Sequence, residues 1–107
     1  MYFRKKNKIM AGSKITLSEA SSMTEKFRIK FPNESMAYMY STEVFQIILS
    51  QENCVGLRIY NGVDENGHLQ TVLVGVDEEG NDLYNGEIYD RSLVCPPKCA
   101  TSNPLNS

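Results

Sequence analysis

The sequence predicts a small α+β domain, a two-layer sandwich in which two helices cover a short mixed or antiparallel three-stranded sheet with a central β-hairpin. Three observations lead to this prediction. The chain has 107 residues, a length that fits one domain. Apolar residues recur at helical spacing over 17–31 and alternate at strand spacing over 54–60. An Asn-Gly pair separates that strand from a second apolar run, as in a hairpin.

The first helix is expected over residues 17–30. Thr16 and Glu19 have the spacing of a capping box, in which each side chain bonds the backbone N–H of the other residue. Pro32 prevents the helix from continuing. The apolar stripe of this helix consists of Leu17, Ala20, Met23, Phe27 and Phe31.

Residues 36–40 suit either a short strand or one face of a helix, and their aromatic side chains favour the strand. A second helix is expected over 43–51, capped by Ser41 or Thr42. Its inner side would carry Val44, Ile47, Ile48 and Gln51.

The hairpin follows. Val55, Leu57 and Ile59 alternate with Arg58 and Tyr60, which is typical of a half-buried strand. Residues 69–76 are apolar on both faces and therefore predict the central strand of the sheet. The turn between them contains Asn66-Gly67, a pair suited to positive φ. Residues 77–82 form a second acidic turn, and residues 83–94 form a short strand or cross the surface. The strand–helix–strand connection is expected to be right-handed.

Charge divides the chain into three parts. Residues 1–14 carry five basic side chains and no acidic one, whereas residues 52–90 carry nine acidic side chains against Arg58 alone. We therefore expect a basic flexible arm over 1–14, a single α+β domain over 15–92 and a Pro- and Cys-containing tail over 93–107. The arm offers weak, salt-sensitive attachment to nucleic acid as a further alternative, but the acidic body opposes such attachment, so we do not expect a nucleic-acid partner.

The tail carries the candidate site. Two prolines stiffen the segment Cys95–Cys99, and stiffness lowers the cost of ordering on binding. We predict a non-catalytic protein-interaction module that contacts a protein partner, or a second copy of the chain, through this tail. The predicted partner-binding residues are Cys95, Pro96, Pro97, Lys98, Cys99 and Leu105.

A thiol-redox or metal-binding module using Cys95 and Cys99 is the main alternative. Lys98 would favour a neighbouring thiolate, but the spacer is one residue longer than in C-x-x-C and its prolines oppose a helix. Cys54 and His68 would complete four zinc ligands, yet they belong at opposite ends of the hairpin. The simplest interpretation is a buried Cys54, an exposed His68 and a free tail pair, with no metal and no cofactor.

Enzyme templates fit poorly. The chain has one histidine, no phosphate-binding glycine loop, and paired carboxylates only in turns. The acidic turns do not match a calcium-binding loop and are expected to be solvated hairpin turns. The apolar runs are too short to cross a membrane, and the odd count of three cysteines together with the lack of a secretion signal favours the cytoplasm.

Several blocks of residues, in this order along the chain, resemble a set of small bacterial proteins of unknown function. The blocks are GLRIY at 56–60, VLVGVD at 72–77, GND at 80–82 and the CPPxC tail at 95–99, followed by Asn103, Leu105 and Asn106. The resemblance covers about residues 16–107. It implies a free-standing bacterial protein of this size, and it carries no activity, substrate or catalytic residue.

Overall fold

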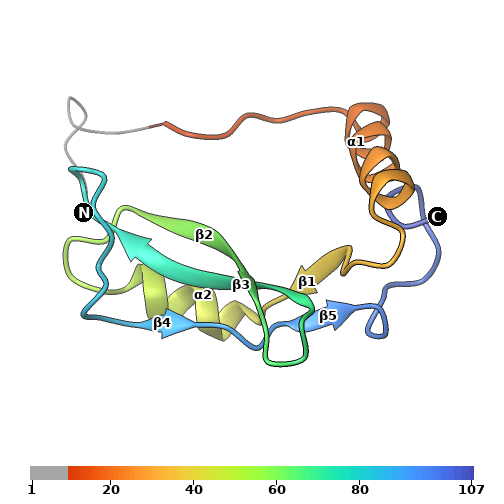
Figure 1. Cartoon of the computed structure of the whole chain (residues 1–107). Helices are drawn as coiled ribbons and strands as arrows, with labels where there is room; N and C mark the ends of the chain where they lie inside the picture. The colour runs from red at the N-terminus through yellow and green to blue at the C-terminus, as the bar shows by residue number, and fades with distance from the viewer. Residues whose placement is uncertain (1–9) are drawn as a thin grey trace.

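The computed structural model describes residues 10–107 and confirms a small α+β fold with two helices and two antiparallel sheets (Figure 1). One sheet has two strands, in the order β1-β5, and the other has three, in the order β2-β3-β4. In chain order the elements are α1 (Leu17–Lys30), β1 (Ala37–Met39), α2 (Thr42–Leu49), β2 (Gly56–Val63), β3 (Leu69–Val76), β4 (Ile88–Tyr89) and β5 (Leu93–Cys95).

Helix α1 has the predicted bounds, and its capping box is present. The backbone N–H of Glu19 donates to Thr16 Oγ1 at 3.0 Å, and the N–H of Thr16 donates to Glu19 Oε1 at 2.9 Å. These bonds lower the pKa of Glu19, because the backbone N–H of Thr16 stabilises its carboxylate. At the other end, Phe31 is the C-cap, immediately before Pro32.

Helix α2 ends at Leu49, two residues earlier than predicted. The Ser50 hydroxyl donates to the carbonyl of Gln46, and the Gln51 side-chain amide donates to the carbonyl of Ile48 at 2.8 Å. Side chains thus supply partners for carbonyl groups at the helix C-terminus. Ser41 is the N-cap residue by backbone conformation, although its side chain makes no capping hydrogen bond.

The three-stranded sheet is centred on β3, as the two-sided apolarity of residues 69–76 predicted. Strand β2 pairs with it so that Ile59 lies opposite Leu73, and β4 pairs on its other side. The prediction that the strand near 36–40 joins this sheet is wrong, because β1 pairs with β5 instead. All strand pairs among residues 10–107 are antiparallel, so the expected right-handed strand–helix–strand connection within one sheet is not formed there.

Segment 35–40 reaches β3 through side chains. The Ser35 hydroxyl donates to the carbonyl of Leu69 at 3.0 Å, and the Tyr40 hydroxyl donates to the carbonyl of Thr71 at 2.9 Å. Ser35 and Thr71 are buried, so these bonds satisfy polar groups that water does not reach. They fix β1, and with it β5, beside the larger sheet.

The two acidic turns share one construction. Asp64 Oδ1 accepts from the backbone N–H groups of Asn66 and His68, at 2.9 Å each, and Gly67 has a φ of +82°. Asn66, expected to share the positive φ, does not need it, because the loop is longer than a two-residue turn. The second turn repeats the pattern with Asp77, Glu79, Asn81 and Gly80.

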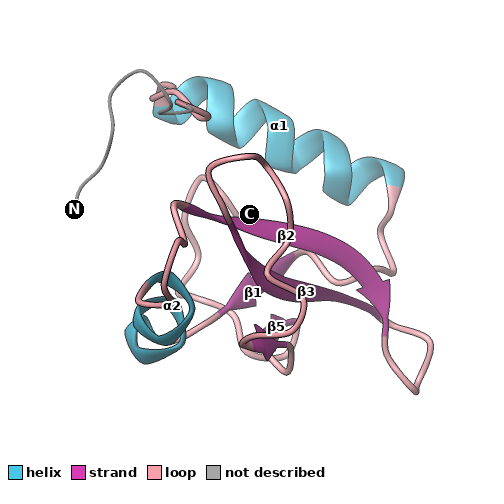
Figure 2. Ribbon diagram, turned by 90° about the vertical axis from the view of Figure 1, so that its left-hand side faces the viewer, coloured by secondary structure: helices cyan, strands magenta, loops and turns pink. Residues whose placement is uncertain are grey.

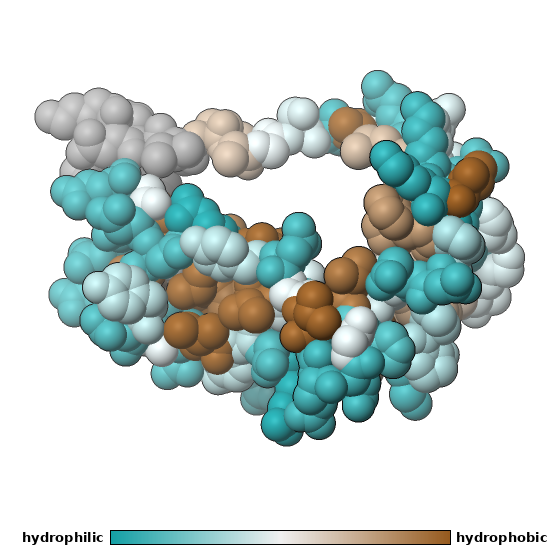
Figure 3. Space-filling model, in the orientation of Figure 1, coloured by the Kyte–Doolittle hydropathy of each residue, from teal (hydrophilic) through white to brown (hydrophobic). Residues whose placement is uncertain are grey.

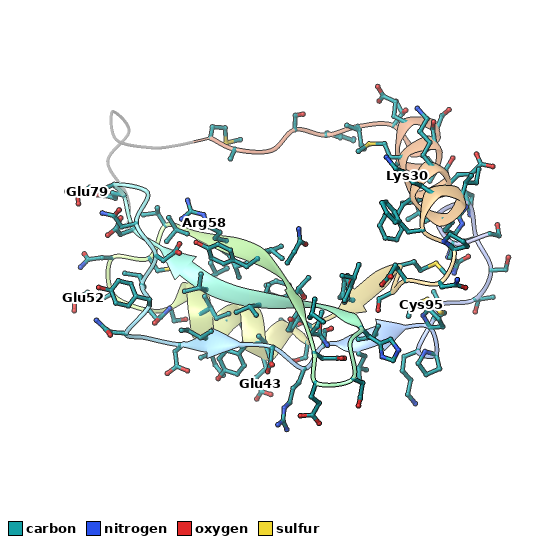
Figure 4. All side chains as sticks on the ribbon, viewed as in Figure 1. Lys30, Glu43, Glu52, Arg58, Glu79 and Cys95 are labelled. Carbon is teal, nitrogen blue, oxygen red and sulfur yellow. A yellow bond between two sulfur atoms is a disulfide. The ribbon has the colours of Figure 1, made fainter. Side chains whose placement is uncertain are left out.

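The core is small and lies mainly between α2 and the three-stranded sheet, with Cys95 buried apart from it at the end of β5 (Figure 4). The buried apolar residues of the described chain are Ile48, Leu73, Val74 and Cys95. Ile48 is the residue of α2 that the helix buries completely, at 0% exposure. Of the other positions predicted for its inner side, Val44 and Gln51 are half-buried and Ile47 is exposed.

Helix α1 does not cover the sheet, contrary to the predicted two-helix layer. It buries no residue, and Leu17 and Met23 of its apolar stripe are exposed. In both ribbon views it stands apart from β2 and β3, and the space-filling view shows an opening between them (Figures 2 and 3). Arg28 instead attaches the helix to the C-terminal segment.

Candidate binding groove

The C-terminal segment, residues 96–107, is folded by its own asparagines. Asn103 Oδ1 accepts from the backbone N–H of Leu105, and Asn106 Oδ1 accepts from that of Asn103, both at 2.8 Å. The Asn106 amide also donates to the carbonyl of Ala100 at 3.1 Å. The polar composition that suggested a trailing tail therefore builds a closed set of turns.

Cys95 and Cys99 form a disulfide, with 4.7 Å between their Cα atoms. The expectation of a free tail pair is wrong. Cys95 ends β5 and is buried, whereas Cys99 is exposed. The backbone N–H of Lys98 donates to the carbonyl of Val94 at 2.9 Å, and this turn brings the two cysteines together. Disulfides are rare in cytosolic proteins, so this bond counts against the cytoplasmic location expected from the sequence, and that location stays a prediction.

Arg28 of α1 holds the far end of the C-terminal segment. Its Nη1 donates to the carbonyl oxygen of Leu105 and its Nη2 to the main-chain oxygen of Ser107, at 2.6 Å each. The segment is thus fixed at both ends, by the disulfide to β5 and by the guanidinium to α1.

A groove of about 600 Å³ lies between this segment and the β1–β5 ribbon. Ala37 pairs with Cys95, and Met39 with Leu93, so these four side chains share one face of the ribbon and form the floor. The C-terminal segment and α1 supply the remaining walls. We call this feature the C-terminal groove; its residues beyond the four of the floor are Thr24, Met36, Tyr38, Lys98, Cys99, Ala100, Asn103, Leu105 and Asn106.

The six predicted site residues are divided between two grooves. Cys95, Lys98, Cys99 and Leu105 line the C-terminal groove. Pro96 and Pro97 line a second groove of about 600 Å³, together with Phe31, His68 and Val94. The proline loop is therefore the partition between the two.

The C-terminal groove is apolar and carries one charged lining residue, Lys98. Arg91 and Lys98 are the charged side chains of residues 91–107, a segment with no acidic residue. Figure 4 places Glu52 and Glu79 at the opposite end of the molecule from Cys95 and Lys30. The groove thus lies away from the acidic end of the domain.

Three of the four floor residues, Ala37, Met39 and Leu93, were not identified from the sequence, and neither was the wall residue Thr24 of α1. The β1–β5 pairing brings the floor residues together from two separate segments, and Thr24 comes from a third segment, helix α1. The apolar residues at 93 and 95, which alternate around Val94, were the available indication of a strand in the predicted tail.

A polar cluster on β2 was also missed. Asp82 accepts from Arg58 Nη1 and from the Tyr60 hydroxyl, and Arg58 Nη1 also donates to the carbonyl of Gly80 at 3.2 Å. The hydrogen bond from Tyr60 lowers the pKa of Asp82 and raises the pKa of Tyr60 itself. The Asp82 carboxylate thus binds both Arg58 and Tyr60, and these hydrogen bonds join β2 to the second acidic turn.

The residues considered as zinc ligands do not come together in the described part of the chain. No three side chains of His, Cys, Asp or Glu gather within residues 10–107. Cys54 lies just before β2, at the end of the hairpin where Gly56 pairs with Val76, and His68 lies in the turn at the other end, where Val63 pairs with Leu69, so the length of the hairpin separates them. The Cys54 thiol, half-buried, donates to the carbonyl of Gly56 at 3.2 Å.

Most of the basic arm, residues 1–9, lies outside the described part of the chain, so its proposed attachment to nucleic acid stays a prediction. Neither helix of residues 10–107 has the length and apolarity that crossing a bilayer requires.

The chain was compared with protein-family models, with curated proteins and with solved structures, and none of them matches it.

Proposed function

We propose that the protein is a non-catalytic interaction module that binds a protein partner in the C-terminal groove. The observation that carries this proposal is a group of large apolar side chains left open at one place. Met39 is 56% exposed, Leu93 48% and Leu105 44%, and all three line the groove. Apolar surface gathered in a concave site is typical of binding surfaces.

The construction of the wall supports the same proposal. The disulfide, the Arg28 contacts and the asparagine turns hold residues 96–107 before any partner arrives. A site that is already ordered loses less conformational entropy on binding. The small core adds a further reason, since a partner that binds only the folded state also stabilises it.

The test compares partner capture by the full-length protein with capture by Leu105→Asp and Met39→Asp. Both variants place a charge in the groove at an exposed position, where the fold tolerates it. Val63→Asp is the matched control, because Val63 is 68% exposed and lies outside the groove. We expect the two groove variants to lose the proteins that wild type and Val63→Asp retain. Equal recovery by all four proteins would overturn the proposal.

Thiol–disulfide exchange is a second candidate, favoured by the bond between an exposed Cys99 and a buried Cys95. In that reaction an external thiolate attacks the Cys99 sulfur, forms a mixed disulfide and releases Cys95 as a thiolate. Wild type is incubated with reduced glutathione, whose thiolate attacks the Cys95–Cys99 bond, and Cys95→Ala is incubated with oxidised glutathione, whose disulfide the Cys99 thiolate attacks with release of one glutathione thiolate; intact mass is then measured for both. A mixed disulfide at Cys99 in the Cys95→Ala variant, together with rapid exchange in wild type, would support this candidate over simple binding.

A further inference from the structure

We propose that the occupant of the C-terminal groove is an extended, acidic and apolar polypeptide segment that adds to the free edge of β1. This inference rests on the proposed function and specifies the partner of the same site. It has three parts, namely the extended conformation, the apolar alternation and the acidic charge, and a different feature of the groove supports each part.

The extended conformation follows from how β1 borders the groove. Four consecutive residues, Met36 through Met39, line it. Successive side chains of a strand point to opposite faces, so a run of four lining residues means that the backbone itself borders the groove. Strand β1 pairs with β5 alone among residues 10–107, which leaves its other edge without a strand neighbour. An unpaired edge beside a groove is the geometry of β-strand addition.

The apolar part follows from the floor. Met39 and Leu93 form one cross-strand pair, and Ala37 and Cys95 form the next, so apolar side chains follow one another along the ribbon. A strand added to the edge of β1 extends the ribbon in its own plane and places every second side chain on the same side as the floor, next to Ala37 and Met39. Its other side chains face solvent or the wall. The partner segment is therefore expected to alternate apolar and polar residues.

The acidic part follows from Lys98. It is the one charged residue in the lining, and the nearby carboxamides of Asn103 and Asn106 already bond the backbone of their own segment. An ammonium group at an apolar groove favours a carboxylate partner and disfavours a basic one. Glu52 and Glu79 lie at the opposite end of the molecule from Cys95 (Figure 4), and residues 91–107, which include Lys98, contain no acidic side chain.

The experiment selects random ten-residue peptides, displayed on phage, against the full-length protein. Clones that also bind Met39→Asp are removed, so that the remaining peptides depend on the groove. Selected peptides are synthesised with a fluorophore, and their Kd values are measured by anisotropy. Circular dichroism and urea midpoints confirm that each protein variant is folded.

We expect alternating apolar residues and at least one Asp or Glu in the selected peptides. Lys98→Glu should weaken their binding at least tenfold, whereas Lys26→Glu, an exposed lysine of α1 outside the groove, should change it less than twofold. N-methylation of successive peptide amides should weaken binding at every second position only, because alternate N–H groups point toward one strand edge.

Peptides that need a helical conformation, carry basic residues, or tolerate N-methylation everywhere would overturn this inference. If such peptides still lose binding to Met39→Asp, the groove remains a binding site and the proposed function stands. Recovery of no groove-dependent peptide also overturns the inference, and partner capture by the groove variants then decides the proposed function separately.

Discussion

Replacing Cys99 by serine should loosen the C-terminal groove and lower the stability of the protein measurably. Cys99 is exposed, so the new hydroxyl remains in water. The remaining Cys95 thiol stays buried, where a cysteine behaves as a small apolar side chain. Loss of the covalent link is therefore the dominant effect of the substitution.

The magnitude follows from the size of the closed loop. The two cysteines are separated by four positions, so the bond closes a loop of five residues. Chain entropy for such a loop gives a stabilisation of about 2 kcal/mol at 25 °C. Cys95→Ser should lower the free energy of unfolding further, by about 1–3 kcal/mol, because it also places a hydroxyl in a buried position.

Urea unfolding followed by circular dichroism measures both effects. With an m-value of about 1–2 kcal/mol per molar urea for a small domain, Cys99→Ser should lower the midpoint by about 1–2 M. A phosphine reductant should lower the wild-type midpoint to the same value and leave Cys99→Ser unchanged. Equal midpoints for wild type and Cys99→Ser, with no effect of reductant on either, would refute the role given to the disulfide.

Three further substitutions test the core and the sheet. Ile48→Ala should cost about 2–5 kcal/mol of unfolding free energy in urea titrations, against about 1 kcal/mol or less for the exposed Ile47→Ala, and equal costs would contradict the packing of α2. Gly75→Ala should lower the free energy of unfolding by about 1–3 kcal/mol, because the added Cβ would lie 2.9 Å from Cys54 Sγ and from Gln51 Nε2. In the control Gly56→Ala the added Cβ meets no atom within 4 Å. Equal shifts of the thermal melting temperature for the two variants would contradict the close packing at Gly75. Asp82→Asn should lower the free energy of unfolding at neutral pH and remove part of its decrease at acidic pH. The pKa of Asp82 in the folded protein lies below its ordinary value of 3.8, so the stabilisation by Asp82 is present above pH 3.8 and is lost as the pH falls through the folded pKa. The free energies of unfolding of wild type and Asp82→Asn should therefore converge between pH 7 and pH 2. A constant difference between them over this range would contradict the role of Asp82 in the cluster.

Local features could be predicted from the sequence with good accuracy. The capping box at Thr16 and Glu19 and the stop at Pro32 fixed both ends of α1, because these interactions involve residues within one or two turns. The hairpin and the central position of β3 followed from alternation and from the two-sided apolarity of residues 69–76.

Long-range placement could not be predicted in the same way. Helical periodicity identifies the apolar stripe of α1 but not what covers it, and Leu17 and Met23 remain exposed. Strand β1 has three residues and pairs with β5, more than fifty positions away. Too few side chains take part for the sequence pattern to select that partner over the hairpin.

The candidate site shows the same division. The stiff segment Cys95–Cys99 and Leu105 were identified from residue types, because proline, paired thiols and a lone apolar residue stand out in a polar segment. The floor of the groove was not identified from the sequence, because Met39 and Leu93 come to lie on one face only through the β1–β5 register. Separation of Pro96 and Pro97 into the second groove likewise depends on the folded path of the loop.

Site-specific photo-crosslinking in the cells that naturally produce the protein tests the central claim most directly. A benzophenone amino acid replaces Leu93, on the floor of the C-terminal groove, or Val63, an exposed residue of β2 outside it. We predict a discrete crosslinked adduct from position 93 that is absent from position 63 and disappears when Leu105→Asp is added. The same adducts from both positions, or none from position 93, would contradict a partner-binding role for the C-terminal groove.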